Sequence, residues 1–154
     1  MTFKFKADKW FNNRVSEDLF DMVAGELLGK GVYRNVYTFL PDDSLVLKVE
    51  TDSGSFANIR EYQMWTTYSY NKKLSKWFAP CVQLSNRGQF LLQKKVGVID
   101  GRKLPDKIPP MIADGHLGNW GIYEDRVVCC DYGNHRSHEI SSKEKFVNAQ
   151  WSKK

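Results

Sequence analysis

The sequence has few of the features that mark membrane, secreted or repetitive proteins. No stretch approaches the roughly 18 apolar residues of a transmembrane helix, and residues 1–6 contain no apolar core of a secretory signal. Only three cysteines occur, and Cys129 and Cys130 are adjacent, so we expect no disulfide framework. Neither internal repeats nor low-complexity tracts are visible. From these absences we predict that the protein resides in a reducing cytoplasm and does not interact with a membrane.

The composition is that of an ordinary globular protein. Hydrophobic residues make up 42% of the 154 positions and charged residues 27%, proportions that argue against disorder. A chain of this length is sufficient for one domain with a buried core. We therefore predict a single domain over residues 1–154, with a modest net charge of +5.

The order of local patterns predicts an α+β fold with a small antiparallel sheet. Residues 1–15 are mixed and aromatic, which indicates a packed arm or a short strand. Ser16 is a suitable N-cap for a helix that Leu19, Phe20, Val23 and Leu27 continue at helical spacing. Further elements follow from strand-forming runs, turn residues and periodicity: strands over 32–40 and 45–50, a helix over 59–71, strands over 81–84 and 90–92, a loop over 97–110, a hairpin over 120–130 and a weak helical pattern over 146–150.

Two elements of the N-terminal half carry chemistry. Gly29 and Gly31 form a glycine-rich turn through which a backbone can approach a polyphosphate, although glycine also commonly ends a helix. Lys48 stands in the middle of an apolar strand. Its side chain either lies on a solvent-exposed face or is a cation for nucleotide phosphates, held by Glu61 of the following helix.

Two further elements lie in the C-terminal half. Asp114 and Asn119 are separated by four residues in a glycine-containing loop, and Asp131 follows a strand-like run. Asn119 and Asp131 offer the hard oxygen ligands that Mg²⁺ prefers. Asp114 is a candidate for orienting or deprotonating an attacking hydroxyl group, and His116 between them either acts as a base or orders the loop.

Taken in order, these residues resemble the signature motifs of the protein-kinase-like superfamily. The glycine loop of that family is matched by Gly29, Gly31 and Val36, with Arg34 in place of the third glycine. Its strand lysine is similar to Lys48, and residues 94–96 correspond to its hinge. The resemblance covers residues 28–133.

The catalytic loop resembles a particular branch of that superfamily. Asp114, His116 and Asn119 follow the spacing of aminoglycoside-phosphotransferase-like loops and of short kinases carried by bacteriophages. Residues 131–133, Asp-Tyr-Gly, resemble the metal-binding Asp-Phe-Gly motif. The segment between residue 96 and Asp114 is too short for the helices of a full large lobe, and no Ala-Pro-Glu segment follows.

The resemblance implies a small lobe over residues 1–96 and a reduced lobe with the catalytic loop over 97–154. It implies ATP and Mg²⁺ as cofactors, and transfer of the γ-phosphoryl group to a protein. For a phage-encoded chain, that protein is expected to be a host protein in the host cytoplasm. The roles it assigns are catalytic for Asp114 and Lys48, nucleotide binding for Gly29, Gly31, Val36, Lys48, Glu61, Lys94 and Val96, and metal binding for Asn119 and Asp131.

Three other interpretations stay open. A nucleotide-binding pseudokinase could act by occupying the surface of a partner protein. A small nucleic-acid-binding domain is suggested by residues 72–107, which carry a net charge of +7 and include Trp77 and Phe78; we favour a solvated face near an anionic nucleotide. A zinc site at Cys129, Cys130, His135 and His138 is disfavoured, because adjacent strand residues point to opposite faces.

The reduced C-terminal lobe suggests a protein partner. Several large apolar side chains lie where a kinase-like cleft would be left open, and we expect them to be exposed and to form a contact with a protein or with a second copy of the chain. These residues are Ile108, Met111, Ile112, Phe146 and Trp151.

Overall fold

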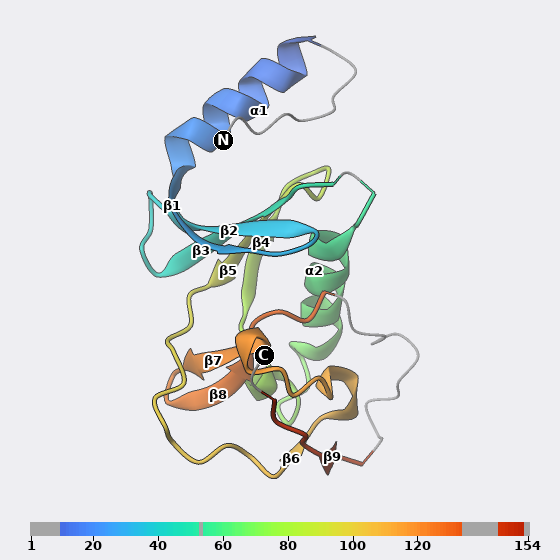
Figure 1. Ribbon diagram of the computed structural model, residues 1–154. Coiled ribbons are helices and arrows are strands. Elements are labelled where there is room, and N and C mark those ends of the chain that lie inside the picture. The colour runs from blue at the N-terminus through green and yellow to red at the C-terminus, as the bar shows by residue number, and fades with distance from the viewer. Residues whose placement is uncertain (1–9, 53, 134–144, 153–154) are drawn as a thin grey trace.

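The computed structural model describes residues 10–52, 54–133 and 145–152 (Figure 1). It contains two α-helices and a five-stranded antiparallel sheet, which confirms the α+β class. The helices are α1 (Trp10–Val23) and α2 (Ala57–Tyr68). The strands are β1 (Ala24–Lys30), β2 (Arg34–Phe39), β3 (Leu45–Glu50), β4 (Cys81–Leu84), β5 (Phe90–Lys94), β6 (Lys107–Ile108), β7 (Trp120–Tyr123), β8 (Arg126–Cys129) and β9 (Val147–Asn148).

The main sheet has the strand order β1-β2-β3-β5-β4. Because side chains alternate along a strand, its two faces differ in character. One face carries Tyr37, Leu47 and Val49, which form a small apolar cluster, and Phe20 of α1 packs edge-on against Tyr37. On the strands β2 and β3, the opposite face carries Arg34 and Lys48, and α2 packs on this side of the sheet (Figure 1).

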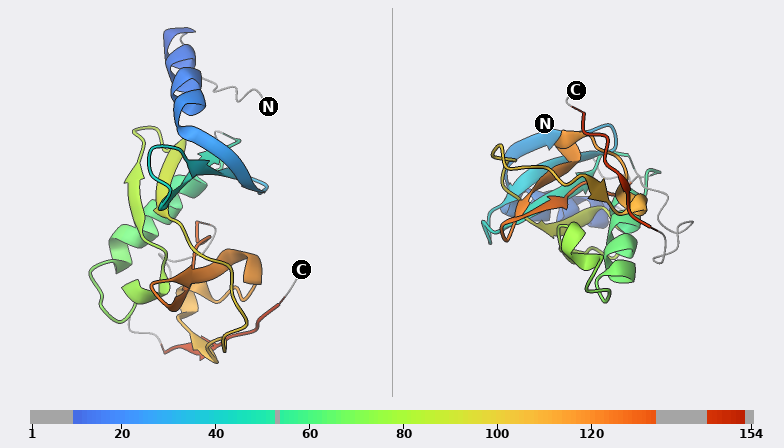
Figure 2. Two further views of the ribbon diagram at one scale, coloured as in Figure 1. Left: turned by 90° about the vertical axis from the view of Figure 1, so that its left-hand side faces the viewer. Right: turned by 90° about the horizontal axis from the view of Figure 1, so that it is seen from below.

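The boundary between α1 and the sheet differs from the prediction. The helix was expected to run from Ser16 to Leu27, but it begins at Trp10 and ends at Val23. Residues 24–30 form strand β1, which pairs with β2. Gly25 permits this pairing, because a Cβ there would lie 2.2 Å from Oγ1 of Thr38. Residues 1–9 of the expected arm lie outside the described residues. Figure 2 shows α1 projecting away from the sheet.

Below the sheet, two small antiparallel pairs complete the fold: β7 with β8 and β6 with β9. Both predicted strands of the final hairpin are confirmed. The remaining predicted strands and the helix over 59–71 are also present, with ends shifted by a few residues. The helix suggested by the weak pattern over 146–150 is wrong. Val147 and Asn148 pair with β6, and the Ala149 N–H donates to the Asp106 carbonyl at 2.9 Å.

The apolar residues of the C-terminal part are not an exposed patch. Ile108, Met111 and Ile112 are at most 2% exposed and belong to the main core, together with Phe78 and other buried side chains. Phe146 and Trp151 are partly buried against the same core, where Trp151 packs edge-on against Trp120. The short connection therefore folds back onto the chain itself, and the expected basis for a partner contact is wrong.

In the described part of the chain, neither helix is long and apolar enough to span a bilayer.

Candidate functional site

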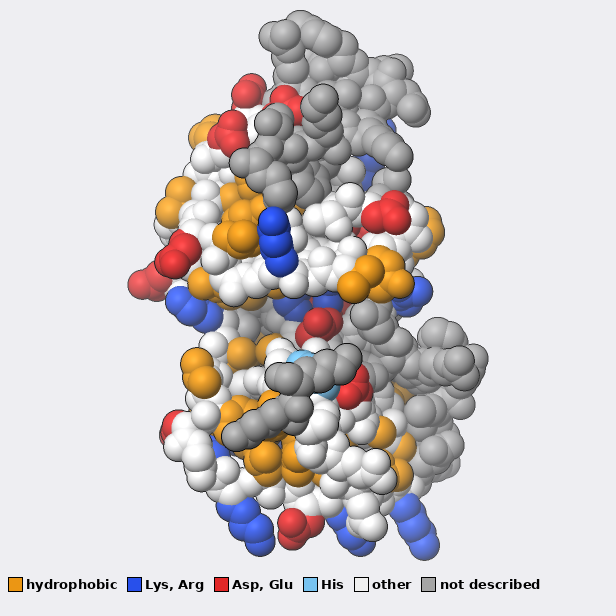
Figure 3. Space-filling view, in the orientation of Figure 1, with side chains coloured by type: hydrophobic (Ala, Val, Ile, Leu, Met, Phe, Trp, Pro, Cys, Tyr) orange, Lys and Arg blue, Asp and Glu red, His pale blue; other side chains and the backbone are white. Residues whose placement is uncertain are grey.

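A cavity of about 580 Å³ opens between the main sheet and the segments on either side of the β7–β8 hairpin, at Gly118 and at Cys130 and Asp131. Figure 3 shows the molecule hollowed at this level, with side chains of both charges gathered there. The lining comes from the β1–β2 turn, from the sheet, from residues 94–98 and from the segment after β8. It includes seven of the predicted site residues: Gly29, Gly31, Val36, Lys48, Lys94, Val96 and Asp131.

The glycine-rich segment is the turn of the β1–β2 hairpin, not a helix end. Gly29 pairs with Val36, and Gly31 N–H donates to the Arg34 carbonyl at 2.7 Å. A Cβ on Gly31 would lie 3.1 Å from the Arg34 carbonyl oxygen, so a side chain here would crowd the turn. At Gly29 and Gly31 the hairpin thus presents backbone without a side chain along the cavity.

Lys48 lies in the centre of β3 and is only 4% exposed, which excludes the interpretation as a solvent-facing side chain. Its Nζ lies 2.5 Å from Oε1 of Glu61 and also donates to the carbonyl oxygen of Cys130. The expected pair of strand lysine and helix glutamate is therefore formed, at the wall of the cavity.

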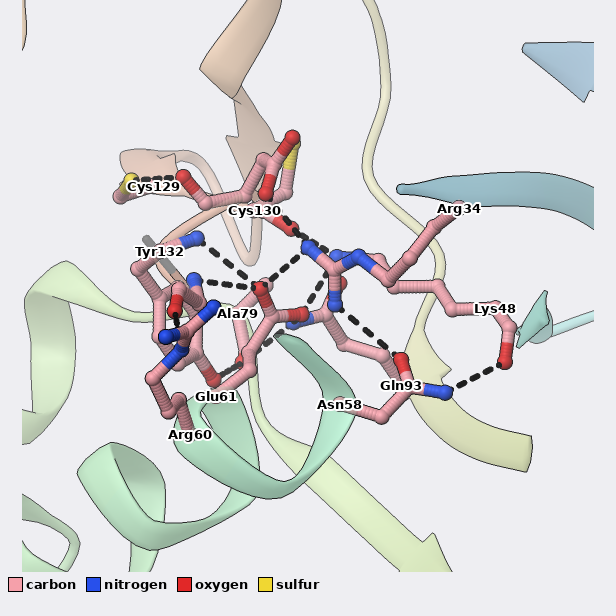
Figure 4. A network of polar contacts seen from close by, with 12 residues as sticks. Arg34, Lys48, Asn58, Arg60, Glu61, Ala79, Gln93, Cys129, Cys130 and Tyr132 are labelled. Carbon is pink, nitrogen blue, oxygen red and sulfur yellow. Dashed lines mark hydrogen bonds and ion pairs between the residues drawn. The ribbon is translucent and has the colours of Figure 1, made fainter. Parts of the chain in front are cut away.

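Glu61 is the centre of a buried polar network (Figure 4). Its side chain is fully buried on α2. Oε1 also accepts from Gln93 Nε2 at 3.1 Å, and Oε2 accepts from the backbone N–H groups of Tyr132 and Gly133, both at 2.9 Å. Burial raises the pKa of Glu61, but the charges of Arg34 and Lys48 outweigh it and hold that pKa below the ordinary value.

Arg34 is the third charged member of this network. It is 7% exposed, and its Nη2 lies 2.9 Å from Oε2 of Glu61 and 2.5 Å from Oδ1 of Asp131. Nη1 donates to Oδ1 of Asn58 at 3.2 Å. Burial lowers the pKa of the guanidinium, but the two carboxylates outweigh this effect and hold that pKa above its ordinary value. Arg34 therefore carries a full positive charge. In the motif that the sequence resembles, this position is that of the third glycine.

Asp131 differs from Glu61 in its exposure, because 46% of its side chain is open to solvent. It follows β8. Its backbone N–H donates to the Asn119 carbonyl at 3.3 Å, and the backbone N–H of Cys130 donates to the same carbonyl at 2.7 Å. These bonds bring the loop with Asn119 next to the end of β8. Asp131 thus links the cavity to the loop.

The Asp114 loop is held by its own hydrogen bonds. Asp114 Oδ1 accepts from the His116 N–H at 3.0 Å, and Oδ2 accepts from Asn119 Nδ2 at 3.2 Å. His116 Nδ1 in turn accepts from the Gly118 N–H at 2.9 Å. His116 therefore orders the loop, as one of the two interpretations predicts. Asp114 is exposed and, like Asn119, does not line the cavity directly.

The polar groups that the sequence analysis missed come from the same buried face. Asn58 donates to three backbone carbonyls and accepts from Arg34, and Gln93 bonds Glu61 while only 1% exposed. Alternation along β2 and β3 places Arg34 on the same face as Lys48, so the sequence alone could have indicated Arg34 as a site residue. Nothing in the local sequence marks Asn58 or Gln93.

The side chains present do not fit a metal ion on Asp131. Oδ1 of Asp131 is in an ion pair with Arg34, and the Asn119 amide is engaged with Asp114. A divalent cation at Asp131 would lie beside the buried guanidinium of Arg34, which is also positively charged. Among the described residues, no group of three His, Cys, Asp or Glu side chains converges as a metal site.

Cys129 and Cys130 are thiols, not the thiolates that a zinc site needs. Burial raises the pKa of the Cys130 thiol to about 11 and that of Cys129 well above its ordinary value, whereas zinc binds thiolates. The two histidines of that interpretation, His135 and His138, lie outside the described residues.

No protein-family model matches the chain, and no curated protein matches it.

Proposed function

We propose that this chain is an ATP-dependent phosphotransferase of the protein-kinase-like type, with a protein as acceptor. The observation that carries the proposal is the buried ion pair of Lys48 and Glu61, at 2.5 Å, in the wall of a cavity that the glycine turn borders. A strand lysine held by a helix glutamate is the arrangement with which kinases bind nucleotide phosphates. In this proposal the sheet and α2 correspond to the small lobe, and residues 97–152 to a reduced large lobe.

The cavity lining suggests how the nucleotide would lie. Val36, Val46 and Val96 offer apolar contacts for the base. Gly29 and Gly31 would let the backbone approach the phosphates, and Lys48 would bind their oxygens. The volume of about 580 Å³ is within the range of pockets that hold molecules of this size.

Asp114 would act on the acceptor. The oxygen of an acceptor hydroxyl group would form a bond to the γ-phosphorus as the bond from that phosphorus to the bridging oxygen breaks, and ADP would leave with the electron pair. Asp114 would orient the hydroxyl group and take its proton. Because Asp114 is exposed, it is accessible to a hydroxyl group on a protein surface. The resemblance also predicts a magnesium ion at Asn119 and Asp131, but the side chains of these residues are engaged with Asp114 and Arg34 and do not fit that ion.

A second candidate function is nucleotide binding without efficient transfer. The observation in its favour is the ion pair between Arg34 and Asp131, which occupies the carboxylate that a kinase of this type gives to the metal. Such a protein would modulate a partner through its nucleotide-bound surface.

Calorimetric titration with ATP tests binding, and transfer of labelled γ-phosphate to the chain itself and to casein tests activity. Lys48→Met should weaken ATP binding at least tenfold, because it removes the cation nearest the phosphates. Lys72→Met is the matched control, since Lys72 is exposed and lies outside the cavity. Lys48→Arg, which keeps the charge, guards against a variant that fails to fold.

Two results decide between the candidates. Binding together with transfer supports the phosphotransferase, and binding without transfer favours the second candidate. An ATP affinity too weak to measure in the wild type, or equal in wild type and Lys48→Met, would exclude both.

A further inference from the structure

Arg34 lines the cavity together with Lys48, which the proposed function gives to the phosphates, and with Asp131, which the resemblance gives to the metal. It lines the cavity as the first residue of β2, two positions from Val36 and therefore on the same face. Its contacts to Asn58, Glu61 and Asp131 use Nη1 and Nη2. Among the described residues, its Nε–H takes part in no hydrogen bond, and guanidinium groups bind phosphate well.

Arg34 and a divalent cation would compete for Asp131. The carboxylate has Oδ1 2.5 Å from Nη2 of Arg34, and a second positive charge there would be repelled by a guanidinium that cannot lose its proton. Arg34 cannot readily move away, because Glu61 and Asn58 hold it from the other side. The positive charge beside Asp131 is thus built into the fold.

The charged groups around the cavity show an excess of positive charge. The lining contains five basic side chains and a single carboxylate, that of Asp131. Buried Glu61 neutralises part of this excess through its contacts with Arg34 and Lys48. A free nucleoside triphosphate is more negative than its complex with a metal ion, and so complements this lining better. The five basic residues are Lys30, Arg34, Lys48, Lys94 and Lys95.

We infer that Arg34 is a built-in counter-cation, and that this chain binds the triphosphate of a nucleotide without a divalent metal ion. The inference rests on the proposed function for the identity of the ligand. It extends that function, because the metal requirement typical of the resemblance is replaced by a residue of the chain. Arginine has a related use in phosphoryl transfer, where it stabilises charge on the transferred group.

The experiment is calorimetric titration of the full chain with ATP, in EDTA and in excess MgCl₂. For the wild type we expect affinity in EDTA to equal or exceed that in MgCl₂. Arg34→Gln, which keeps a polar side chain of similar length without the charge, should lose at least tenfold in affinity in EDTA. Arg126→Gln is the matched control, since Arg126 is paired with Glu124 on the surface and does not line the cavity; it should bind as the wild type does.

The outcomes separate this inference from the proposed function. A wild-type affinity that rises tenfold or more with MgCl₂ would overturn the role of Arg34 and leave the proposed function standing. Absence of ATP binding under both conditions would overturn both. The comparison of the wild type in two buffers needs no variant, so it decides the matter even where Arg34→Gln fails to fold. Arg34→Lys should restore part of the affinity in EDTA.

Discussion

Nη2 of Arg34 lies 2.5 Å from Oδ1 of Asp131, although 97 positions separate the two residues in the chain. One end of this ion pair is buried and the other is half open to solvent. The same guanidinium nitrogen contacts Glu61 at 2.9 Å. A single cation thus joins the sheet, α2 and the segment after β8 at the cavity.

The direction in which Asp131→Asn changes the ATP affinity shows whether Asp131 is a metal ligand or only the partner of Arg34. The variant removes one negative charge from a cavity that binds an anion, so ATP affinity in EDTA should stay the same or increase. A metal ligand would show the opposite: weaker binding in MgCl₂. Titration of ATP into both proteins in both buffers measures the difference. Because Asp131 is half exposed, we expect the variant to lose no more than about 1 kcal/mol of stability.

Acid should unfold the protein partly through Glu61. Its folded-state pKa, about 2, lies below the ordinary value of 4.5, because the effect of burial, which raises the pKa, is outweighed by the positive charges of Arg34 and Lys48. The unfolded state therefore binds the proton first as pH falls, and the stabilisation from this carboxylate, complete above pH 4.5, is lost between 4.5 and about 2. Thermal melting across this window measures the loss. The melting should be measured in the Asp100→Asn variant as well. The exposed Asp100 also has a lowered pKa, caused mainly by its hydrogen bond with Arg102, and the variant removes its contribution to the acid dependence. A melting temperature that stays constant over the window would contradict the prediction.

Asp114→Asn should leave ATP binding unchanged and reduce transfer about 10²–10⁴-fold, the usual contribution of a positioned acid–base group. The amide keeps the shape of the side chain, and Asp114 is exposed and outside the cavity lining. Binding isotherms beside a transfer assay test both halves of the statement. Equal transfer by variant and wild type would remove Asp114 from the mechanism.

The C-terminal part should behave as core and not as an accessory loop. Ile112 is fully buried in the main cluster, so Ile112→Ala should lower the free energy of unfolding by about 2–5 kcal/mol. Val98→Ala, at a side chain 89% exposed, should change it by less than about 0.5 kcal/mol. Urea denaturation compares the two. Similar midpoints would mean that residues 97–133 contribute little to the fold.

Local patterns were sufficient to predict much of the sheet. Strand-forming residues and turn residues mark β2, β3 and the β7–β8 hairpin, and all three are present. The spacing that extended α1 to Leu27 also suits a strand, and pairing with β2 decides between the two only in the folded chain. The β9 strand is likewise defined by its partner, since two residues carry almost no periodicity.

The candidate site was predictable where the chemistry is carried by residue type. A lysine in an apolar strand and a glutamate on the next helix are visible in the sequence, and Lys48 and Glu61 do form an ion pair. The role of Arg34 depends on contacts made across the fold to Glu61 and Asp131. Burial of Ile108 depends on how residues 97–112 turn back onto the core, which local sequence does not specify.

One carboxylate of α2 accepts the backbone N–H groups of Tyr132 and Gly133. These two amide hydrogens can exchange with solvent only after Glu61 has separated from the segment that follows β8. Their exchange rates therefore report how often the segment after β8 detaches from α2. A ligand that spans the cavity would contact both sides, and would slow exchange at these two amides even though it touches neither of them.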